Sequence, residues 1–173
     1  MRAAGAPLAD EQWVGLLRAA NTSAWRLEQQ PSYVFDTESG WPERWHAGDR
    51  TRPDYIAEWS AEFIRPYVER GGSIIRVRVV DDPMTPTQQW ADWAAEANRA
   101  AGEQIELMPR RMAEDLGIVD NPLIDWWLID GTTLLLMTHN TDGLLLEVRL
   151  GDETAVARTH EIWRIATEAI DNR

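Results

Sequence analysis

The sequence has no cysteine and no lysine among its 173 residues. The absence of cysteine excludes disulfide bonds, thiol nucleophiles and cysteine-ligated zinc. The absence of lysine excludes a Schiff-base mechanism through a lysine amine. All 17 basic residues are therefore arginines, which stay charged at any working pH and form fork-like pairs with carboxylates or phosphates.

Histidine is scarce, and the spacing of His46, His139 and His160 fits no metal-binding motif. We expect His160 to be a packed, hydrogen-bonded residue of a C-terminal helix, and His139 to be exposed beside a turn. The sequence also lacks a P-loop, a GxGxxG turn and a GxSxG elbow. We therefore predict no metal, no cofactor and no catalytic residues.

Long apolar runs are missing as well. A membrane-spanning helix needs about 18 apolar residues in a row, and a signal peptide needs an apolar core near the N-terminus. The net charge is −12, from 17 basic and 29 acidic residues. This balance opposes binding to nucleic acids or anionic membranes, because phosphate groups attract a basic face. We expect a cytoplasmic protein that binds neither directly.

Tryptophan, in contrast, is abundant, with ten residues. Tryptophan side chains anchor cores through their large apolar area, and they also line binding surfaces. We expect core anchors together with some residues at a binding surface. The pattern does not decide whether Trp41 and Trp45 are exposed.

The first part of the chain, residues 8–72, is predicted to be helical and extended. Residues 23–36 alternate as an extended segment does, and residues 37–53 form a polar loop. The predicted boundaries are an N-cap at Asp10, a break at Pro31, a second helix from Asp54, a kink at Pro66 and a stop at Gly71–Gly72.

The second part, residues 73–173, is richer in strands. A helix with Trp90 and Ala101 on its apolar face follows the first strand, and a helix opened by Asp152 ends the chain. Residues 110–122 are predicted to be a polar connection, and residues 140–143 a tight turn. Strands are predicted at 73–80, 104–109, 125–130, 132–139 and 144–150.

This order of elements predicts the fold class. Strand, helix and strand across 73–108 favour a right-handed parallel crossover. The meander that follows is expected to add antiparallel strands to the same sheet. We therefore predict a single domain, residues 1–173, of the mixed α/β class, with helices packed on the faces of a mixed sheet.

Residues 73–140 resemble one half of a phospholipase-D-like domain, through their element order and Asp130-Gly131. In that superfamily a His-x-Lys pair precedes the Asp, and a Gly-Ser-x-Asn follows it. Here Leu123 and Asp125 stand at the histidine and lysine positions. Met137 and Thr138 replace Gly-Ser, whereas Asn140 matches. The resemblance thus implies a half-domain topology that lacks the His-x-Lys motif, with Asp130 more simply explained as a turn residue.

A second resemblance spans nearly the whole chain. The segments SAWRLEQQPSY, GGSIIRVRVVDDPMT, NRAAGEQIELMPR, DWWLIDGTTLLLM and TDGLLLEVRL, in this order, resemble an actinobacterial domain-of-unknown-function family. Its Arg-Leu-Glu is matched by residues 26–28, its Arg-x-Arg-Val-Val by residues 76–80, and its Asn before Ala-Gly-Glu by residues 98–103. Gln89-Trp90 and the loop 37–53 depart from its pattern.

The second resemblance implies a regulatory role, because members often lie beside helix-turn-helix regulators of the Xre type. The first hypothesis is therefore a non-enzymatic regulatory or accessory protein that binds a protein partner, such as a helix-turn-helix regulator, or a small ligand. The alternative is a divergent phosphodiesterase-like enzyme. In it, Arg76 and Arg78 would hold an anionic substrate, and Asp130 or Glu28 would act in acid–base catalysis.

For both hypotheses we predict one polar binding cluster, partly buried and edged by tryptophans. It contains Arg26, Glu28, Arg76 and Arg78, and Asp130 is a further candidate binding residue. A purely structural interpretation stays open for the strand arginines: they would pair with nearby carboxylates or lay their stems across the sheet.

Overall fold

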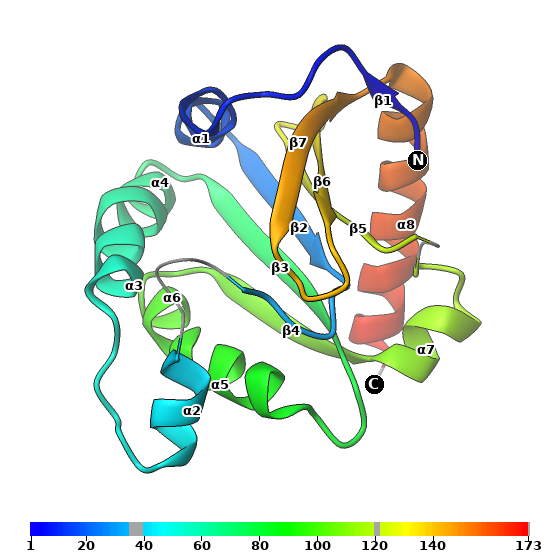
Figure 1. Cartoon of the computed structure of the whole chain (residues 1–173). Helices are drawn as coiled ribbons and strands as arrows, with labels where there is room; N and C mark the ends of the chain where they lie inside the picture. Colours follow the sequence, from blue (N-terminus) through cyan, green and yellow to red (C-terminus); the bar gives the residue numbers. More distant parts are fainter. Residues whose placement is uncertain (35–39, 120–121, 173) are drawn as a thin grey trace.

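A seven-stranded mixed sheet forms the centre of the protein in the computed structural model, which describes residues 1–34, 40–119 and 122–172 (Figure 1). The order of strands across the sheet is β1-β7-β6-β5-β2-β3-β4. The mixed α/β class predicted from the sequence is confirmed. The strands are β1 (Ala3–Ala4), β2 (Ser23–Glu28), β3 (Ser73–Val80), β4 (Gln104–Pro109), β5 (Ile124–Ile129), β6 (Thr133–His139) and β7 (Leu145–Gly151).

Strand β2 joins the two predicted halves of the sheet. It pairs in parallel with β3, which in turn pairs in parallel with β4 across the predicted crossover. On its other side β2 runs antiparallel to β5, the first strand of the meander. Arg26 therefore lies in register with Arg76 on one neighbour and with Trp127 on the other. Three residues that are far apart in the sequence meet in this way on adjacent strands.

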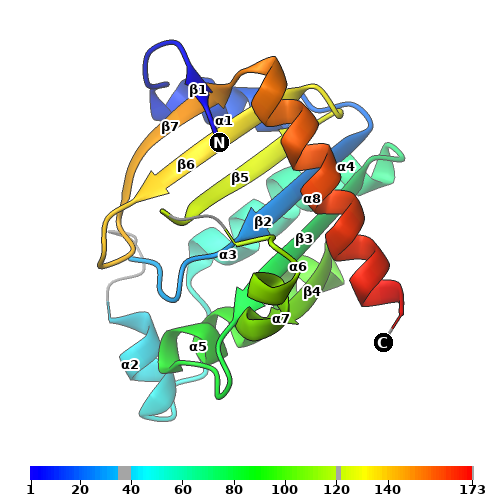
Figure 2. The same ribbon diagram turned by 90° about the vertical axis from the view of Figure 1, so that its right-hand side faces the viewer.

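Helices cover both faces of the sheet (Figures 1 and 2). Helices α7 and α8 lie on one face, and α1, α3, α4, α5 and α6 lie on the other, with α2 packed beside α5. The helical elements are α1 (Asp10–Arg18), α2 (Trp41–His46), α3 (Asp54–Trp59), the π-helical turn η1 (Ser60–Ile64), α4 (Arg65–Glu69), α5 (Pro86–Ala94), α6 (Glu96–Ala100), α7 (Arg110–Asp115) and α8 (Glu153–Asp171).

The alternation of side chains along the strands builds two cores. On β5, Trp126 is fully buried against α8, where its ring meets Trp163 edge-on at 6.0 Å. The next residue, Trp127, is buried in the other core, with Phe63 and Ile64 of the π-helical turn. Adjacent tryptophans can serve two cores because neighbouring strand residues point to opposite faces of a sheet.

Four predicted local features were wrong. The first helix is capped by Ala9, and Asp10 is its first residue, where the carboxylate accepts from the indole N–H of Trp13 at 3.1 Å. The supposed loop 37–53 contains α2, which starts after Gly40, and the connection 110–122 contains α7. Both helices have six residues, too few to show a helical period in the sequence. The helix after β3 is interrupted at Ala95.

Several predicted boundaries are confirmed. Asp152 caps α8 by accepting from the backbone N–H of Ala155 at 2.8 Å. The chain turns at Gly71, whose φ is +87°, a conformation that favours glycine. The kink predicted at Pro66 stays a prediction; the helix instead contains a π-helical turn, Ser60–Ile64, before α4, and Pro66 lies in the first turn of α4. Residues 35–39, in the extended segment and the loop, and residues 120–121, in the polar connection, lie outside the described residues.

Both histidine predictions need correction. His160 is exposed, although its Nε2 does lie 2.7 Å from the carbonyl oxygen of Gly131. The buried face of α8 carries Ile162 and Trp163 instead. His139 is half-buried, with its ring edge-on to Tyr33 at 5.5 Å, and burial lowers the pKa of His139 to about 4.

Candidate functional site

A cavity of about 350 Å³ lies between the sheet and the helices on the α3–α6 side. Strands β2, β3 and β5 form its floor, and α1, α3, α5 and α6 form its walls. The volume falls in the lower part of the range found for small-molecule sites. Its lining includes Trp13, Leu17, Arg26, Glu28, Tyr33, Tyr55, Ile56, Trp59, Arg76, Arg78, Thr87, Trp90, Ala91, Ala94, Ala95, Asn98 and Trp127.

Glu28 is the centre of an ion-pair cluster on the cavity floor. Its Oε1 accepts from Nη1 of Arg76 at 2.7 Å and lies 3.0 Å from Nη2 of Arg26. Its Oε2 accepts from Nε of Arg78 at 2.6 Å. The register of the parallel strands β2 and β3 explains the cluster, because it sets Arg26 beside Arg76 and Glu28 beside Arg78. The structure thus brings together four of the five residues proposed from the sequence.

A second carboxylate stands behind the cluster. Glu103, which follows α6 and precedes β4, is buried, and its Oε1 accepts from Nε of Arg76 at 2.8 Å. Arg76 therefore bridges Glu28 and Glu103. Burial by itself lowers the pKa of Arg76, but the two carboxylates outweigh this and raise that pKa above its ordinary value. Arg76 is a fixed structural cation.

Glu28 is held in its charged form. Burial by itself would raise the pKa of Glu28, but the guanidiniums of Arg26, Arg76 and Arg78 overcome this and hold the pKa well below its usual range. Glu28 therefore carries a negative charge at neutral pH. A carboxylate so fixed does not exchange protons near neutral pH, which argues against the acid–base role considered for it.

Several hydrogen-bond donors around the cluster have no acceptor among the described residues. Among the described residues, Nε of Arg26 and Nη1 of Arg78 are buried and have no acceptor. The same is true of the indole nitrogens of Trp90 and Trp127. Each of these four residues lines the cavity. Since buried donors are almost always paired in proteins, this surplus makes the cavity suited to a molecule that supplies acceptors.

Aromatic side chains enclose the space above the cluster. The guanidinium of Arg26 lies over the ring of Trp127, with 4.9 Å from Cζ to the ring centroid. Trp90 and Trp127 are buried at the interior of the cavity, whereas Trp13 and Trp59 are half-buried. The prediction that tryptophans edge the polar cluster agrees with this geometry.

The π-helical turn supports the wall from behind through Ser60. Ser60 opens this turn, and its hydroxyl lies 2.7 Å from Oδ1 of Asn98 on α6. Both side chains are buried, and Asn98 lines the cavity. Single π-helical turns are common at functional sites because they redirect the side chains that follow. Here the turn couples α6 to the helical segment that carries Tyr55 and Trp59.

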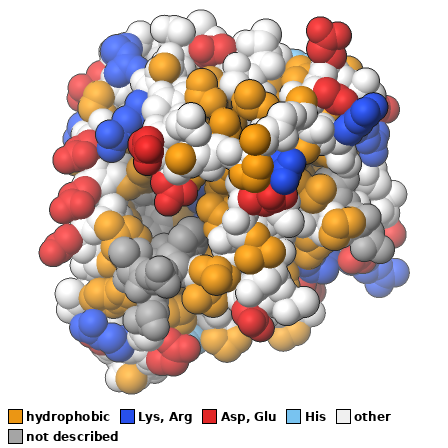
Figure 3. All heavy atoms as spheres, turned by 45° about the horizontal axis from the view of Figure 1, so that its top comes forward, with side chains coloured by type: hydrophobic (Ala, Val, Ile, Leu, Met, Phe, Trp, Pro, Cys, Tyr) orange, Lys and Arg blue, Asp and Glu red, His pale blue; other side chains and the backbone are white. Residues whose placement is uncertain are grey.

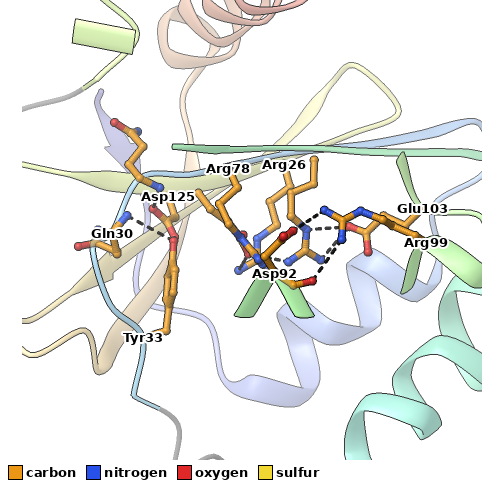
Figure 4. Close-up of polar contacts among 11 residues, drawn as sticks. Arg26, Gln30, Tyr33, Arg78, Asp92, Arg99, Glu103 and Asp125 are labelled. Atoms are coloured by element: carbon orange, nitrogen blue, oxygen red, sulfur yellow. Dashed lines mark hydrogen bonds and ion pairs between the residues drawn. The ribbon is translucent and has the colours of Figure 1, made fainter. Parts of the chain in front are cut away.

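Tyr33 and Asp125 form a second polar pair, at the end of the cluster away from Glu103 (Figure 4). The hydroxyl of Tyr33 donates to Oδ2 of Asp125 at 2.6 Å, and the backbone N–H of Gln29 donates to Oδ1 at 2.7 Å. Burial raises the pKa of Asp125 to about 6, although these hydrogen bonds and Arg26 oppose the rise. Asp125 is therefore the buried carboxyl group of this region that titrates close to neutral pH.

Asp130 is not part of the cluster. It stands in the β5–β6 turn with φ +50°, and its carboxylate accepts from the backbone N–H groups of Asn21, Thr22 and Ser23 at 2.7–3.1 Å. These hydrogen bonds hold the pKa of Asp130 well below its usual range, in spite of an opposing effect of burial. Asp130 thus fastens the segment before β2 to the turn. Its interpretation as a turn residue agrees with the structure, and it does not line the cavity.

Within the described parts of the chain, no three histidine or carboxylate side chains are grouped so that they could hold a metal ion. The residues that best fit a small molecule are instead the arginines and tryptophans of the cavity. Arginine forks bind carboxylates and phosphates, and aromatic rings stack on flat molecules. The arrangement is suited to binding an anionic organic molecule.

Sequence reasoning missed several residues of this site. Glu103 was noted only for its likeness to a family pattern, and Trp127 and Tyr33 were not linked to the arginines. The available signal was Asp125, a carboxylate at the start of a strongly apolar strand, since such a buried charge needs partners. The pairing of β2 with β5 could not be read from the sequence, and that pairing places Trp127 beside Arg26.

Comparison with protein families identifies the chain. Residues 11–171 match the model of a domain of unknown function, DUF6879. The chain belongs to the DUF6879 family. The matched region includes the whole ion-pair cluster and every described element that lines the cavity. No curated protein matches the chain. Among the described residues of this DUF6879 protein, no helix is long and apolar enough to span a membrane.

Proposed function

We propose that this DUF6879 protein is a ligand-binding regulatory module, whose cavity receives a small organic molecule. The observation that carries the proposal is the cavity floor, where buried arginines keep unpaired donors beneath walls of aromatic and aliphatic side chains. A purely structural ion-pair cluster would require neither a cavity above it nor surplus donors. The ion pairs then hold the binding groups in place before the ligand arrives, which lowers the ordering cost of binding.

The proposal is tested by ligand-detected NMR with a chemically diverse set of small molecules. The control is Ala94→Trp, which fills the cavity from α5, where Ala94 is buried. We expect compounds that bind the wild-type protein and lose binding in the folded variant, whose fold is checked by circular dichroism. If no compound binds, or if binding is equal in both proteins, the cavity is not a ligand site.

The regulatory part of the proposal involves a protein partner, and the family resemblance suggests a helix-turn-helix regulator of the Xre type in an actinobacterial setting. An exposed apolar surface supports a protein contact. Figure 3 shows hydrophobic side chains gathered on the face that carries β7. Leu144, Leu146 and Leu150 are all more than one third exposed, as is Val34, which bridges to Leu144. Exposed apolar patches of this kind are common at interaction sites.

The phosphodiesterase-like alternative gains less support. Asp130 lies in a turn outside the cavity, and Glu28 is saturated by three guanidiniums. Both acid–base groups considered for that alternative are therefore occupied by stabilising contacts. The phospholipase-D-like half-domain topology stays a prediction.

A further inference from the structure

The charges of the lining residues limit the chemical class of ligand that the cavity can bind. Among the described lining residues, three are cations, Arg26, Arg76 and Arg78, and one is an anion, Glu28. Glu103 and Asp125 stand behind the lining and are near enough to interact with Arg76 and Arg26, respectively. Their charges bring the group of six close to neutrality. The space itself thus faces an excess of positive charge without a large unbalanced charge beneath it.

This balance limits the charge of a ligand. One negative charge placed beside Arg78 would leave this near-neutral group with a single unbalanced charge, which the unpaired donors of Arg78 and Arg26 can stabilise by hydrogen bonds. Two charges, as on a phosphate monoester, would leave a buried anion unpaired, because Glu28, Glu103 and Asp125 already occupy the guanidiniums in part. The whole chain carries a net charge of −12, which adds to the repulsion. The site therefore favours a monoanion.

Arg78 is the residue with the most unused capacity. Its Nε donates to Glu28, but its Nη1 is buried without an acceptor among the described residues, and its side chain is 8% exposed. Arg26 has a free Nε and is paired with Glu28 at its Nη2. A carboxylate, with two oxygens in one plane, can accept from such donors better than a halide or a hydroxyl group can.

The enclosure sets the shape of the ligand. Trp90 on α5 and Trp127 on β5 are buried, and Tyr33, Trp13 and Trp59 complete an aromatic lining. Flat rings stack on such surfaces with little loss of conformational entropy. The indole N–H groups of Trp90 and Trp127 have no acceptor among the described residues and are further donors in the lining.

We propose that the cavity binds planar aromatic monocarboxylates, with the carboxylate held by Arg78 and Arg26 and the ring packed among the aromatic side chains that line the cavity, where Trp13 and Trp59 are half-buried. This inference rests on the proposed ligand-binding function and deepens it. Arg76 has a different part, since its paired donors fix the orientation of Glu28 and so of the two arginines that meet the ligand.

Isothermal titration calorimetry with four probes tests the inference. The probes are 2-naphthoate, the neutral 2-naphthalenemethanol, 2-naphthyl phosphate as a dianion at pH 7.5, and acetate. We expect 2-naphthoate to bind at least about tenfold more tightly than each of the other three, because the alcohol lacks the charge, acetate lacks the ring, and the phosphate carries a second charge that the site does not balance. Arg78→Gln should remove this preference, and Arg65→Gln, on the exposed surface of α4, should keep it.

The comparison between probes uses the wild-type protein, so it holds even if Arg78→Gln fails to fold. Equal or tighter binding of the neutral alcohol or of the phosphate would overturn the monocarboxylate class. Failure of all four probes, when other compounds of the diverse set bind in the cavity, would also overturn the class while leaving the ligand-binding function intact. If nothing of any class binds, the inference falls together with the proposed function.

Discussion

Arg26 and Arg76 lie opposite each other on the parallel strands β2 and β3, and both reach the same carboxylate oxygen of Glu28, at 3.0 and 2.7 Å. Two guanidiniums this close together would repel each other without the shared anion. Glu28 is therefore the residue on which the whole cavity floor depends. Because all three side chains are largely buried, solvent cannot replace the missing charge if Glu28 is removed.

Replacement of Glu28 by glutamine should destabilise the protein by about 3–5 kcal/mol, because it leaves three buried guanidiniums with one fewer counter-charge. Urea denaturation of the wild-type protein and of Glu28→Gln measures this difference. The matched control is Glu106→Gln on β4, where the side chain is exposed and the change should cost less than about 0.5 kcal/mol. Equal stability of the two variants would show that the cluster does not depend on Glu28.

Asp125 should make stability depend on pH in a defined direction. Burial raises its pKa to about 6, so the folded protein holds a proton that the unfolded chain has lost above pH 4. The free energy of unfolding of the wild-type protein, relative to Asp125→Asn, should therefore fall by about 3 kcal/mol between pH 4 and pH 6 and stay level above that. The neighbours Arg26, Glu28 and Tyr33 remain in both proteins and cancel in the comparison. A difference that is constant from pH 4 to pH 8 would contradict the raised pKa.

Asp130 should act on stability and not on ligand binding. Asp130→Ala removes the acceptor of three backbone N–H groups and places alanine at φ +50°, a conformation that alanine tolerates less well than aspartate, for an expected loss of about 2–3 kcal/mol. Because its pKa is lowered in the folded state, this contribution should be fully present above about pH 4 and decrease as the pH falls toward the lowered pKa, so it should be smaller at pH 3 than at pH 7. Chemical denaturation at pH 7 and pH 3 measures it, with the exposed Asp142→Ala as control. A changed affinity for a cavity ligand in the folded variant would place Asp130 in the site after all.

We predict that a protein partner contacts the exposed apolar side chains of β7. Leu146 is 60% exposed, so Leu146→Asp should change the free energy of unfolding by less than about 0.5 kcal/mol. The same variant should lose a protein partner that the wild-type protein retains in an affinity pull-down, because a charge would be buried at the contact. Ala157→Asp on α8 adds the same charge at an exposed position elsewhere and should retain the partner. Retention of that partner by Leu146→Asp would remove β7 from the interface.

The sequence allowed much of the fold to be predicted, for identifiable reasons. The alternation in 73–80 and the turn residues at 140–143 are local signals, and both elements are confirmed. Helix α7 lacked such a signal because it makes fewer than two turns. The place of β2 between β3 and β5 is a long-range pairing, which no local pattern encodes.

Some residues of the candidate site could also be predicted from the sequence, and others depend on the tertiary structure. Arg26, Glu28, Arg76 and Arg78 could be singled out because charged residues on strands with apolar neighbours must find partners. The distances among them, and the addition of Glu103, Asp125 and Trp127, depend on how β2, β3, β5 and the end of α6 come together. Asp130 was proposed as a site residue because it matches a catalytic position of the phospholipase-D-like pattern. In the structure its carboxylate accepts hydrogen bonds from the backbone before β2 and stabilises the turn.

The most direct test of the cavity as a ligand site is an NMR titration of the tryptophan indole N–H resonances with 2-naphthoate. The account predicts that the signals of Trp90 and Trp127 shift as the ligand is added, because both side chains line the cavity. The signals of Trp25 and Trp163 should stay in place, since these two rings stack on each other at 5.0 Å beneath α8, on the opposite face of the sheet. Shifts at Trp25 and Trp163 with none at Trp90 and Trp127 would contradict the account.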